Sequence, residues 1–454
     1  MNLLKKQHDT DMTEGSIGLL LVRFALPLMI GNVFQQLYNT VDSIVVGNYV
    51  GKQALAAVGC TGPIINAFIG FFGGLAGGGG VVISQYFGAK DRDKLHSAVQ
   101  TTITLTLLLS VVLTMLGVVF TPALLRMMKT PADVLPEAGE YLTIYFWGLA
   151  GLLLYNMGSG ILRAVGDSTR PLYFLIFSAV TNTVLDILFV KSFHMGIAGA
   201  AVATIVAQFL SALLVMRTLI RAEADYRLSW RELRLDRGTL RRVCAIGIPS
   251  ALQMSLTAVS NVFVQSYINR FESSCMAGWA AYNKIDAFAL LPLMSLSMAV
   301  TTFVGQNIGA GKLKRANKGP AAALRIGLCV LVVILIPLMV YAPRLVSLFN
   351  QEPEVLKFGT LFIRMISPFY VLCSINQIYS GALRGIGDTK ASMLIMLFSF
   401  VLFRQIYLFT VFRLGGGIIP VALGYPAGWI MCSSLMLIYY YRGGWKKRMN
   451  LTEQ

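Results

Sequence analysis

Twelve long apolar runs dominate this chain and restrict it to one architecture. They lie at about 17–46, 53–86, 97–120, 136–161, 171–190, 196–216, 243–268, 276–305, 319–341, 358–383, 391–412 and 418–441. A helix needs roughly 20 apolar residues to cross a bilayer, and each run meets that length. None shows the alternation of apolar and polar residues that a barrel strand requires. We therefore expect an all-α integral membrane protein with twelve transmembrane helices.

The composition supports this reading. Only 13% of the residues are charged, whereas soluble domains contain about 25%. The net charge is +17, and a basic balance can indicate nucleic-acid binding. Here, however, Lys and Arg stand between the apolar runs, where they act as topology signals, so we expect no nucleic-acid partner. The first run, from about Ile17 to Val46, is too long for a signal peptide and is expected to be retained.

The basic residues also indicate the orientation in the membrane. The termini and the even-numbered connections between runs hold 25 Lys and Arg residues, among them Lys5, Lys6, Lys446, Lys447 and Arg448, against eight in the odd-numbered connections. Because basic residues concentrate on the cytoplasmic side, this bias predicts a multi-pass plasma-membrane protein with both termini in the cytoplasm.

Several classes of function are disfavoured by what the sequence lacks. No connection is long enough to fold into a soluble catalytic or nucleotide-binding domain, and no Walker A pattern is present, so we expect no use of ATP. Six scattered cysteines form no C-x-x-C pair, and His8, His96 and His194 are far apart. We therefore expect neither an enzyme nor a zinc site nor a cofactor.

The two halves of the chain repeat each other at an offset of about 221 residues. SGILRAVGDS at 159–168 corresponds to SGALRGIGDT at 380–389, with six of ten positions identical. Pro27 likewise matches Pro249. Since each half has six runs, both enter the membrane from the same side, which predicts a parallel repeat.

This repeat divides the chain into an N-terminal lobe (1–216, helices 1 to 6), a cytoplasmic linker (217–242) and a C-terminal lobe (243–454, helices 7 to 12). Duplicated bundles of this kind usually hold substrate between the halves and alternate access by rocking. A duplicated bundle with a structural or channel role is the alternative.

Polar residues inside the apolar runs of the first half are the candidate site. A carboxylate in the membrane is costly, which makes Asp42 and Asp186 functional candidates by default. Asp186 shares a helical face with Asn182, and Thr204 lies midway along the next run. Asn32, Gln35 and Asn39 precede Asp42 at helical spacing, which puts them on one face. We expect Asp42, Asn182, Asp186 and Thr204 to form the coupling site and the other three to line the substrate cavity.

Carboxylate, amide and hydroxyl oxygens suit a proton or a hard monovalent cation such as Na⁺. Two close carboxylates in a low dielectric cannot easily both ionise, so a proton or sodium ion would neutralise the pair and act as the coupling ion. The same groups could instead join helices through hydrogen bonds, an alternative that weighs most for Asn32, Gln35 and Asn39.

The second half does not repeat the acids, because Asp42 matches Val264 and Asp186 matches Tyr407 or its neighbour. A neutral polar stripe of Gln253, Thr257 and Asn261 remains and is expected to face the substrate. The other charges within the runs are given a structural interpretation, with Arg325 and Arg404 able to snorkel to an interface: Lys284, Asp286, Arg325, Arg364 and Arg404.

The repeated L-R-x-x-G-D motif and the glycines at 73–80 have structural explanations. In the motif, the glycine permits a tight turn and the aspartate (Asp167 or Asp388) caps the following helix. The glycines at 73–80 permit close helix packing.

Together these residues resemble the multidrug and toxic compound extrusion (MATE) transporters over the whole chain. The resemblance rests on Pro27 and Asp42 in helix 1, Gly88–Ala89 after helix 2, LRAVGD with its copy LRGIGD, and the helix 5 and 6 residues Asn182, Asp186 and Thr204. That last set resembles the family's DinF-like branch. NorM-like members carry a glutamate in helix 7 where this chain has Thr257, so no second-lobe cation site is expected, although Asp388 matches the acid of the repeated motif.

The resemblance implies proton- or sodium-coupled export of amphipathic, cationic drugs or toxic compounds by a V-shaped pair of lobes around a central cavity. It also implies a hinge at Pro27. A lipid-linked oligosaccharide flippase of the same superfamily and an integral-membrane transferase are the alternatives. The expected partners are a small organic molecule and the bilayer, with the protein acting as a monomer.

Overall fold

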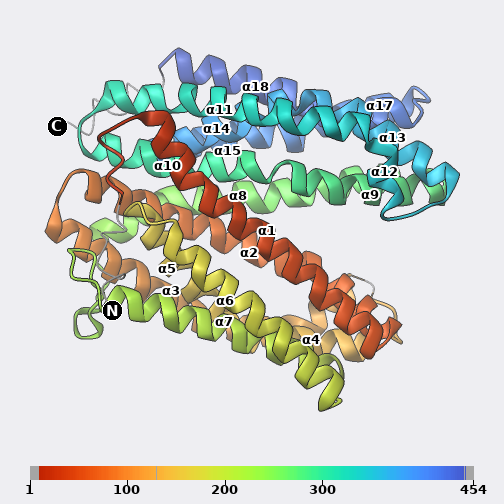
Figure 1. The fold of residues 1–454 in the computed structure, drawn as a ribbon, viewed down its shortest axis with the longest axis horizontal. Coiled ribbons are helices and arrows are strands. Elements are labelled where there is room, and N and C mark those ends of the chain that lie inside the picture. Colours follow the sequence, from red (N-terminus) through yellow and green to blue (C-terminus); the bar gives the residue numbers. More distant parts are fainter. Residues whose placement is uncertain (1–9, 129, 444, 446–454) are drawn as a thin grey trace. The chain divides into compact units, whose positions relative to one another are not determined.

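The computed structural model describes residues 10–128, 130–443 and 445, and every regular element in this part of the chain is helical (Figure 1). The first half contains α1 (Ile17–Tyr49), α2 (Lys52–Gly88), α3 (Arg92–Met127), α4 (Leu135–Trp147), α5 (Leu149–Ala164), α6 (Thr169–Asp186), the π-helix η1 (Ile187–Ser192) and α7 (Gly196–Ile220). The expected all-α fold class is confirmed.

The second half repeats this order after a short 3₁₀ turn. Its elements are η2 (Trp230–Glu232), α8 (Arg237–Ile268), α9 (Ser273–Ala289), α10 (Leu291–Gly309), α11 (Leu313–Val340), α12 (Ala342–Ser347), α13 (Pro353–Ile366), the 3₁₀ turn η3 (Ser367–Phe369), α14 (Tyr370–Ile386), α15 (Thr389–Leu397), the π-helix η4 (Phe398–Phe403), α16 (Arg404–Arg413), α17 (Ile418–Ala422) and α18 (Gly424–Tyr441).

Within the described residues, eleven helical segments are long and apolar enough to cross a membrane. The twelfth expected run, 136–161, is formed by α4 and α5, which meet at Gly148 and are 13 and 16 residues long. The Cβ of any larger residue at 148 would stand 2.2 Å from a side-chain carbon of Ile205, so the close approach of α7 requires glycine at this break.

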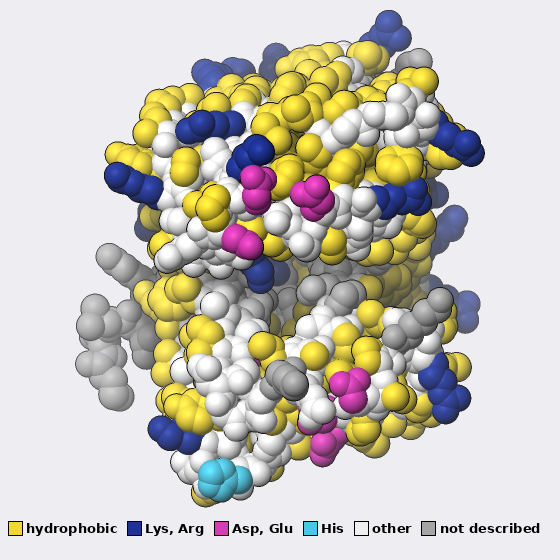
Figure 2. All heavy atoms as spheres, turned by 90° about the vertical axis from the view of Figure 1, so that its right-hand side faces the viewer, with side chains coloured by type: hydrophobic (Ala, Val, Ile, Leu, Met, Phe, Trp, Pro, Cys, Tyr) yellow, Lys and Arg dark blue, Asp and Glu magenta, His cyan; other side chains and the backbone are white. Residues whose placement is uncertain are grey.

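The surfaces of the long helices carry the stripes that contact with lipid requires. On α3, Leu108, Val111, Val112, Met115 and Val119 follow one helical face and are each at least half exposed. Figure 2 views the molecule from the right-hand side of Figure 1, where many helices end and hydrophobic side chains are mixed with polar ones. Large exposed apolar stripes are unstable in water but stable in a bilayer, so the chain is a multi-pass membrane protein.

The chain forms two compact units whose boundaries lie beside the paired prolines. The first unit comprises Ile30–Gly247 with the described residues before Met12, and the second comprises Met12–Met29 with the residues from Ile248 onward. The beginning of α1 therefore packs in the second unit, and the beginning of α8 packs in the first. Pro27 and Pro249, each of which removes a backbone hydrogen bond inside its helix, lie within two residues of these crossings.

The first unit is held together by apolar packing and by one very close approach of two helices. Its core includes Leu142, Phe146 and Ala200 in one cluster, and Ile83 in another. A Cβ on Gly78 of α2 would stand 2.5 Å from the backbone of Gly247 of α8. The expected role of the glycines at 73–80 in close helix packing is thus confirmed at Gly78.

The segment 217–242 lies against the first unit as a strap. The side chain of His96 lies 2.6 Å from that of Glu232, and the amide of Asp236 donates to the hydroxyl of Thr101. Gln100 reaches the carbonyl of Arg227 on the same strap. The expected basic residues Lys5, Lys6, Lys129, Lys446, Lys447 and Arg448 lie outside the described residues.

The two copies of the L-R-x-x-G-D motif share a turn but differ in their aspartates. Gly166 and Gly387 both have left-handed φ values, 93° and 92°, as expected for glycine in a tight turn. Asp167 accepts hydrogen bonds from the amides of Thr169 and Arg170 and so caps α6. The expectation that Asp388 caps its helix is wrong: its side chain makes no capping bond and accepts the hydroxyl of Tyr439 on α18.

Candidate functional site

The four residues expected to form the coupling site converge inside the first unit. Asp42 comes from α1, Asn182 and Asp186 from α6, and Thr204 from α7. They are 8%, 1%, 0% and 4% exposed, respectively. The side-chain amide of Asn182 donates to the hydroxyl of Thr204 across 3.4 Å, and the carboxylates of Asp42 and Asp186 lie close enough to interact. Helix α1 and the consecutive helices α6 and α7 thus bring these side chains together.

Four oxygen atoms of this cluster lack hydrogen-bond partners among the described residues. Oδ1 of Asp42, Oδ1 of Asn182 and both carboxylate oxygens of Asp186 are buried and accept no hydrogen bond from a described residue. Buried polar atoms are nearly always hydrogen-bonded, so four unpartnered oxygens in one place need an explanation. A proton shared by the carboxylates, or a bound cation, supplies one.

The donor set decides which cations fit. It offers two carboxylates, one amide oxygen and one hydroxyl, all of them hard ligands. Among the described residues, no group of three or more His, Cys, Asp and Glu side chains is placed to hold a metal ion. The cluster therefore fits a proton or a monovalent cation better than a transition metal, whose sites use nitrogen and sulfur ligands.

The π-helix η1 follows Asp186 directly. Asp186 is the last residue of α6, and η1 begins at Ile187. Short π-helical segments inside α-helices are frequent at functional sites, and their wider turn interrupts the regular backbone hydrogen-bond ladder. The apolar pattern of this run gave no sign of the change in helix type.

Three tyrosines near the carboxylates were missed by the sequence reasoning. Tyr38 on α1 and Tyr141 on α4 interact electrostatically with both Asp42 and Asp186. Tyr145 stacks near Tyr141 with ring centroids 6.4 Å apart. The signal for Tyr38 was its i−4 spacing from Asp42, and that for Tyr141 and Tyr145 was their own i, i+4 spacing. The hydroxyls of Tyr38 and Tyr141 add polar groups to the cluster.

The residues expected to line the substrate cavity are less uniform. On α1, Gln35 and Asn39 are exposed and Asn32 is half-buried, whereas Asp42 is buried. On α8, Gln253 is buried and its amide contacts the sulfur of Met396. The hydroxyl of Thr257 donates a hydrogen bond to the backbone carbonyl of Gln253. The six predicted substrate contacts remain a prediction: Asn32, Gln35, Asn39, Gln253, Thr257 and Asn261.

In the second unit, the half-buried Asp286 and the buried Arg404 do not pair with each other. The carboxylate of Asp286 accepts the hydroxyls of Tyr282 and Tyr370. Arg404 is 2% exposed, so the expectation that it snorkels to an interface is wrong. Its guanidinium instead donates to Ser260 and to Asn261, the last member of the predicted stripe. Arg325 does lie exposed on α11.

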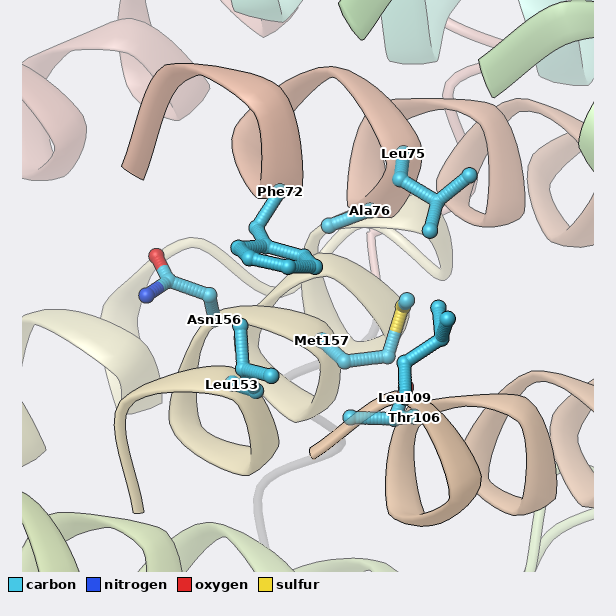
Figure 3. Close-up of a pocket in the computed structure, with 8 residues that line it drawn as sticks. All are labelled: Phe72, Leu75, Ala76, Thr106, Leu109, Leu153, Asn156 and Met157. Atoms are coloured by element: carbon cyan, nitrogen blue, oxygen red, sulfur yellow. The ribbon is translucent and has the colours of Figure 1, made fainter. Parts of the chain in front are cut away.

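None of the four cluster residues lines the small cavity in the first unit that Figure 3 shows. Its volume is about 10 Å³, and it is lined by Phe72, Leu75, Ala76, Thr106, Leu109, Leu153, Asn156 and Met157. The lining is mostly apolar, and the amide of Asn156 already donates to the carbonyl of Leu152. This space holds one water molecule at most, so it is a gap in packing.

The family of the chain is shown by a family model that matches both halves of the repeat. The MatE family model matches the chain twice, at residues 27–188 and 249–409. The chain belongs to the MatE family. Each match begins at one of the paired prolines and covers the helices that carry the repeated motif, which confirms the duplication inferred from the sequence.

Relatives support the same membership. The probable multidrug resistance protein YpnP of Bacillus subtilis is 32% identical over 450 residues, which cover 98% of this chain and 99% of YpnP. An FAD transporter of Shewanella oneidensis is 26% identical and covers 88% of both chains. Members of the MatE family are membrane transporters and not enzymes, and this chain is such a transporter.

The fold agrees with solved MatE structures. One was described as the outward-facing conformation of a multidrug resistance MATE family transporter of the MOP superfamily. It superposes with a TM-score of 0.90 at 23% identity, over 99% of each chain. At this identity the likeness concerns the fold, in which two six-helix halves follow each other along the chain.

Proposed function

We propose that this transporter is an antiporter that exports amphipathic compounds across the plasma membrane in exchange for protons or sodium ions. The observation that carries the proposal is the buried cluster of Asp42, Asp186 and Asn182 with four unpartnered oxygens. No Lys or Arg among the described residues forms an ion pair with either carboxylate, so a mobile cation must neutralise them.

The coupling follows from the low dielectric around the pair. Two ionised carboxylates close together repel each other strongly when water is excluded. A proton or a sodium ion removes that repulsion and allows the helices that carry the acids, α1 and α6, to pack closely. Release of the ion favours a different arrangement of the same helices, which a bound compound can stabilise. Ion and compound therefore exchange, with alternating access in each cycle.

The position of Pro27 supports a role in this change. It lies in α1 fifteen residues before Asp42, beside the crossing from the second unit to the first. Proline weakens a helix locally because it lacks an amide hydrogen and clashes with the preceding turn. We propose that α1 bends there when the ion is released.

We also propose an N-terminal lobe at 1–216, a linker at 217–242 and a C-terminal lobe at 243–454. Within this division, α1 and α8 pass from one compact unit to the other beside Pro27 and Pro249.

The relatives suggest the cargo. YpnP is named a probable multidrug resistance protein, and amphipathic organic cations are the first compounds to test. We propose that the chain belongs to the DinF-like branch, because the acids lie in the first unit and Thr257 stands where NorM-like members carry a helix 7 glutamate. Both termini are proposed to lie in the cytoplasm, and the protein to act as a monomer without ATP.

The test is efflux of a fluorescent organic cation, rhodamine 123, from proteoliposomes under a sodium gradient and a pH gradient imposed separately. We expect one gradient to drive efflux by the wild type. Asp42→Asn and Asp186→Asn should abolish the response to that gradient, whereas Asp133→Asn, at an exposed position before α4, should retain it.

Two results would count against the proposal. Retention of full coupled efflux by Asp42→Asn would show that the first-unit cluster is not the coupling site. Insensitivity of folded wild type to both gradients would exclude ion-coupled antiport and favour a lipid-linked cargo.

A further inference from the structure

We propose that the second unit contains an anion-binding subsite in which the guanidinium of Arg404 takes a carboxylate, or a similar oxyanion, of the transported compound. This inference rests on the proposed function, because it names the chemical class of cargo that the transporter accepts. All of its residues belong to the second unit: Ser260 and Asn261 on α8, Phe400 in η4, Arg404 on α16 and Tyr425 on α18.

The burial of Arg404 is the first observation. Its side chain lies in a membrane-spanning helix and is 2% exposed, and no described Asp or Glu approaches it within ion-pair distance. A charged residue inside a membrane bundle is costly and normally pairs with an acid or serves function. The hydrogen-bond partners of Arg404 are neutral. No negative charge in the described chain therefore balances the charge of its guanidinium.

The second observation is the incomplete hydrogen bonding of the guanidinium. Nη2 donates to Oγ of Ser260 at 2.7 Å and to Oδ1 of Asn261 at 2.9 Å, whereas the buried Nε has no hydrogen-bond partner. Nε and Nη2 together form the edge along which a carboxylate binds arginine with two parallel hydrogen bonds. One donor of this fork is unpartnered, and the other is held by weak neutral acceptors that a carboxylate can replace.

The aromatic neighbours fix this fork in place. The guanidinium carbon lies 4.9 Å from the ring centre of Tyr425 and 5.7 Å from that of Phe400. Stacking on aromatic rings orients the plane of the guanidinium without using its hydrogen-bond donors. A ligand therefore meets a preorganised fork, and little side-chain entropy is lost on binding.

A ligand carboxylate reaches Arg404 at Asn261. It is exposed on α8, it is the last residue of the predicted substrate stripe, and its Oδ1 covers Nη2 of Arg404. A carboxylate that displaces this amide oxygen reaches both Nη2 and Nε. The predicted stripe of Gln253, Thr257 and Asn261 is neutral, but its last residue contacts the positive charge of Arg404.

Asp286 does not already occupy Arg404. Asp286 accepts the hydroxyls of Tyr282 and Tyr370, and Tyr425 interacts electrostatically with both Asp286 and Arg404. The carboxylate of Asp286 therefore has its own donors, and the guanidinium keeps its fork for another group.

The location of Arg404 parallels that of the first-unit acid. The fifth helix of each half contains a π-helix; Asp186 directly precedes η1, and Arg404 directly follows η4. The first half thus places a negative charge at its π-helix and the second half a positive one. Compounds that carry an anionic group, zwitterions included, match the second unit, whereas a pure cation gains nothing from Arg404.

The test uses rhodamine 110, which has a free carboxylate, and rhodamine 123, its methyl ester. KM for efflux of each dye is measured in proteoliposomes under the gradient that drives the wild type. We expect Arg404→Gln to raise KM for rhodamine 110 about tenfold, since a hydrogen-bonded charge is lost, and to leave KM for rhodamine 123 within about twofold. Arg413→Gln, at the exposed end of the same helix, should change neither value.

Arg404→Lys provides a second variant that keeps the charge but loses the fork. It should weaken rhodamine 110 selectively and by less than Arg404→Gln, which keeps the test valid even if the glutamine variant does not fold. Equal effects on the two dyes in the folded variants would overturn the subsite while leaving the proposed function intact. Absence of gradient-driven efflux of both dyes by the wild type would overturn the proposed function and, with it, the subsite.

Discussion

The amide of Asn182 donates to the hydroxyl of Thr204 at 3.4 Å, and this bond leaves the amide oxygen of Asn182 buried without a partner. The hydroxyl thus sets the orientation of the amide, with its nitrogen toward α7 and its oxygen available to the cluster around Asp42 and Asp186. A residue that appears to be a simple helix contact therefore controls what the neighbouring carboxylates present to an ion.

Replacing this hydroxyl should weaken ion binding. Thr204→Val keeps the side-chain shape but removes the acceptor, at a cost of about 1 kcal/mol, so the ion concentration for half-maximal efflux should rise about fivefold. Thr204→Ser, which keeps the hydroxyl, should stay near wild type. The measurement is efflux against the concentration of the coupling ion; equal behaviour of the valine and serine variants would remove this role.

Neutralising one acid should stabilise the protein while it abolishes coupling. In sodium-free buffer at high pH, both carboxylates of the wild type tend to ionise and repel, and Asp186→Asn removes that repulsion. We expect its Tm in detergent to exceed that of the wild type by about 2–4 °C. The repulsion disappears when a proton or sodium ion binds, so the difference should shrink at low pH or in saturating sodium. A constant difference under all conditions would argue against a shared ion.

The contact between Gly78 and Gly247 should not tolerate a side chain. A methyl group at Gly78 would stand 2.5 Å from the backbone of Gly247, whereas one at Gly77 would meet nothing within 4 Å. Overpacking of this kind costs about 1–3 kcal/mol. Gly78→Ala should therefore lower Tm by several degrees and Gly77→Ala should not. Thermal unfolding followed by size-exclusion chromatography distinguishes the two variants, and identical curves would contradict the contact.

The two motif aspartates should respond differently to substitution. Asp167 accepts the amides at the beginning of α6, and loss of such a cap costs roughly 0.5–2 kcal/mol. Asp167→Ala should lower Tm, and Asp167→Asn, which can still accept these bonds, should recover most of the loss. At the second copy, the effects of Tyr439→Phe and Asp388→Ala should overlap in part, because the hydroxyl of Tyr439 is one partner of that carboxylate. Additive effects in the double variant would exclude this pairing.

Asp236 should contribute to stability only above its pKa. Its carboxylate accepts the amide of Thr239 at 2.7 Å, and this hydrogen bond lowers the pKa of Asp236 below its ordinary value. A carboxyl group whose pKa is lowered by folding stabilises the folded state above the unfolded pKa and loses that contribution as the pH falls through the folded pKa. Asp236→Ala should therefore lower Tm near neutral pH, and its curve should approach that of the wild type as the pH falls below about 4. A difference that persists at low pH would assign the effect to packing.

Features within a single helix were predictable from the sequence. The length of each apolar run fixed where the chain crosses the membrane, and i, i+4 spacing placed Asn182 and Asp186 on one face. The offset between the two LR-x-x-GD motifs revealed the duplication. Each of these follows from the local geometry of the helix, which does not depend on the rest of the chain.

Relationships between helices were decided by the tertiary structure. The approach of Tyr141 to the two acids, the burial of Arg404 behind Asn261, and the different partners of Asp167 and Asp388 all depend on which faces meet. We predicted from the sequence that Arg404 snorkels to an interface, because the sequence of a single helix gives no measure of how deeply its side chains are buried. The beginnings of α1 and α8 likewise pack in the unit of the other half. A sequence pattern determines the face of a helix on which a side chain lies, whereas packing among residues hundreds of positions apart determines what that face contacts.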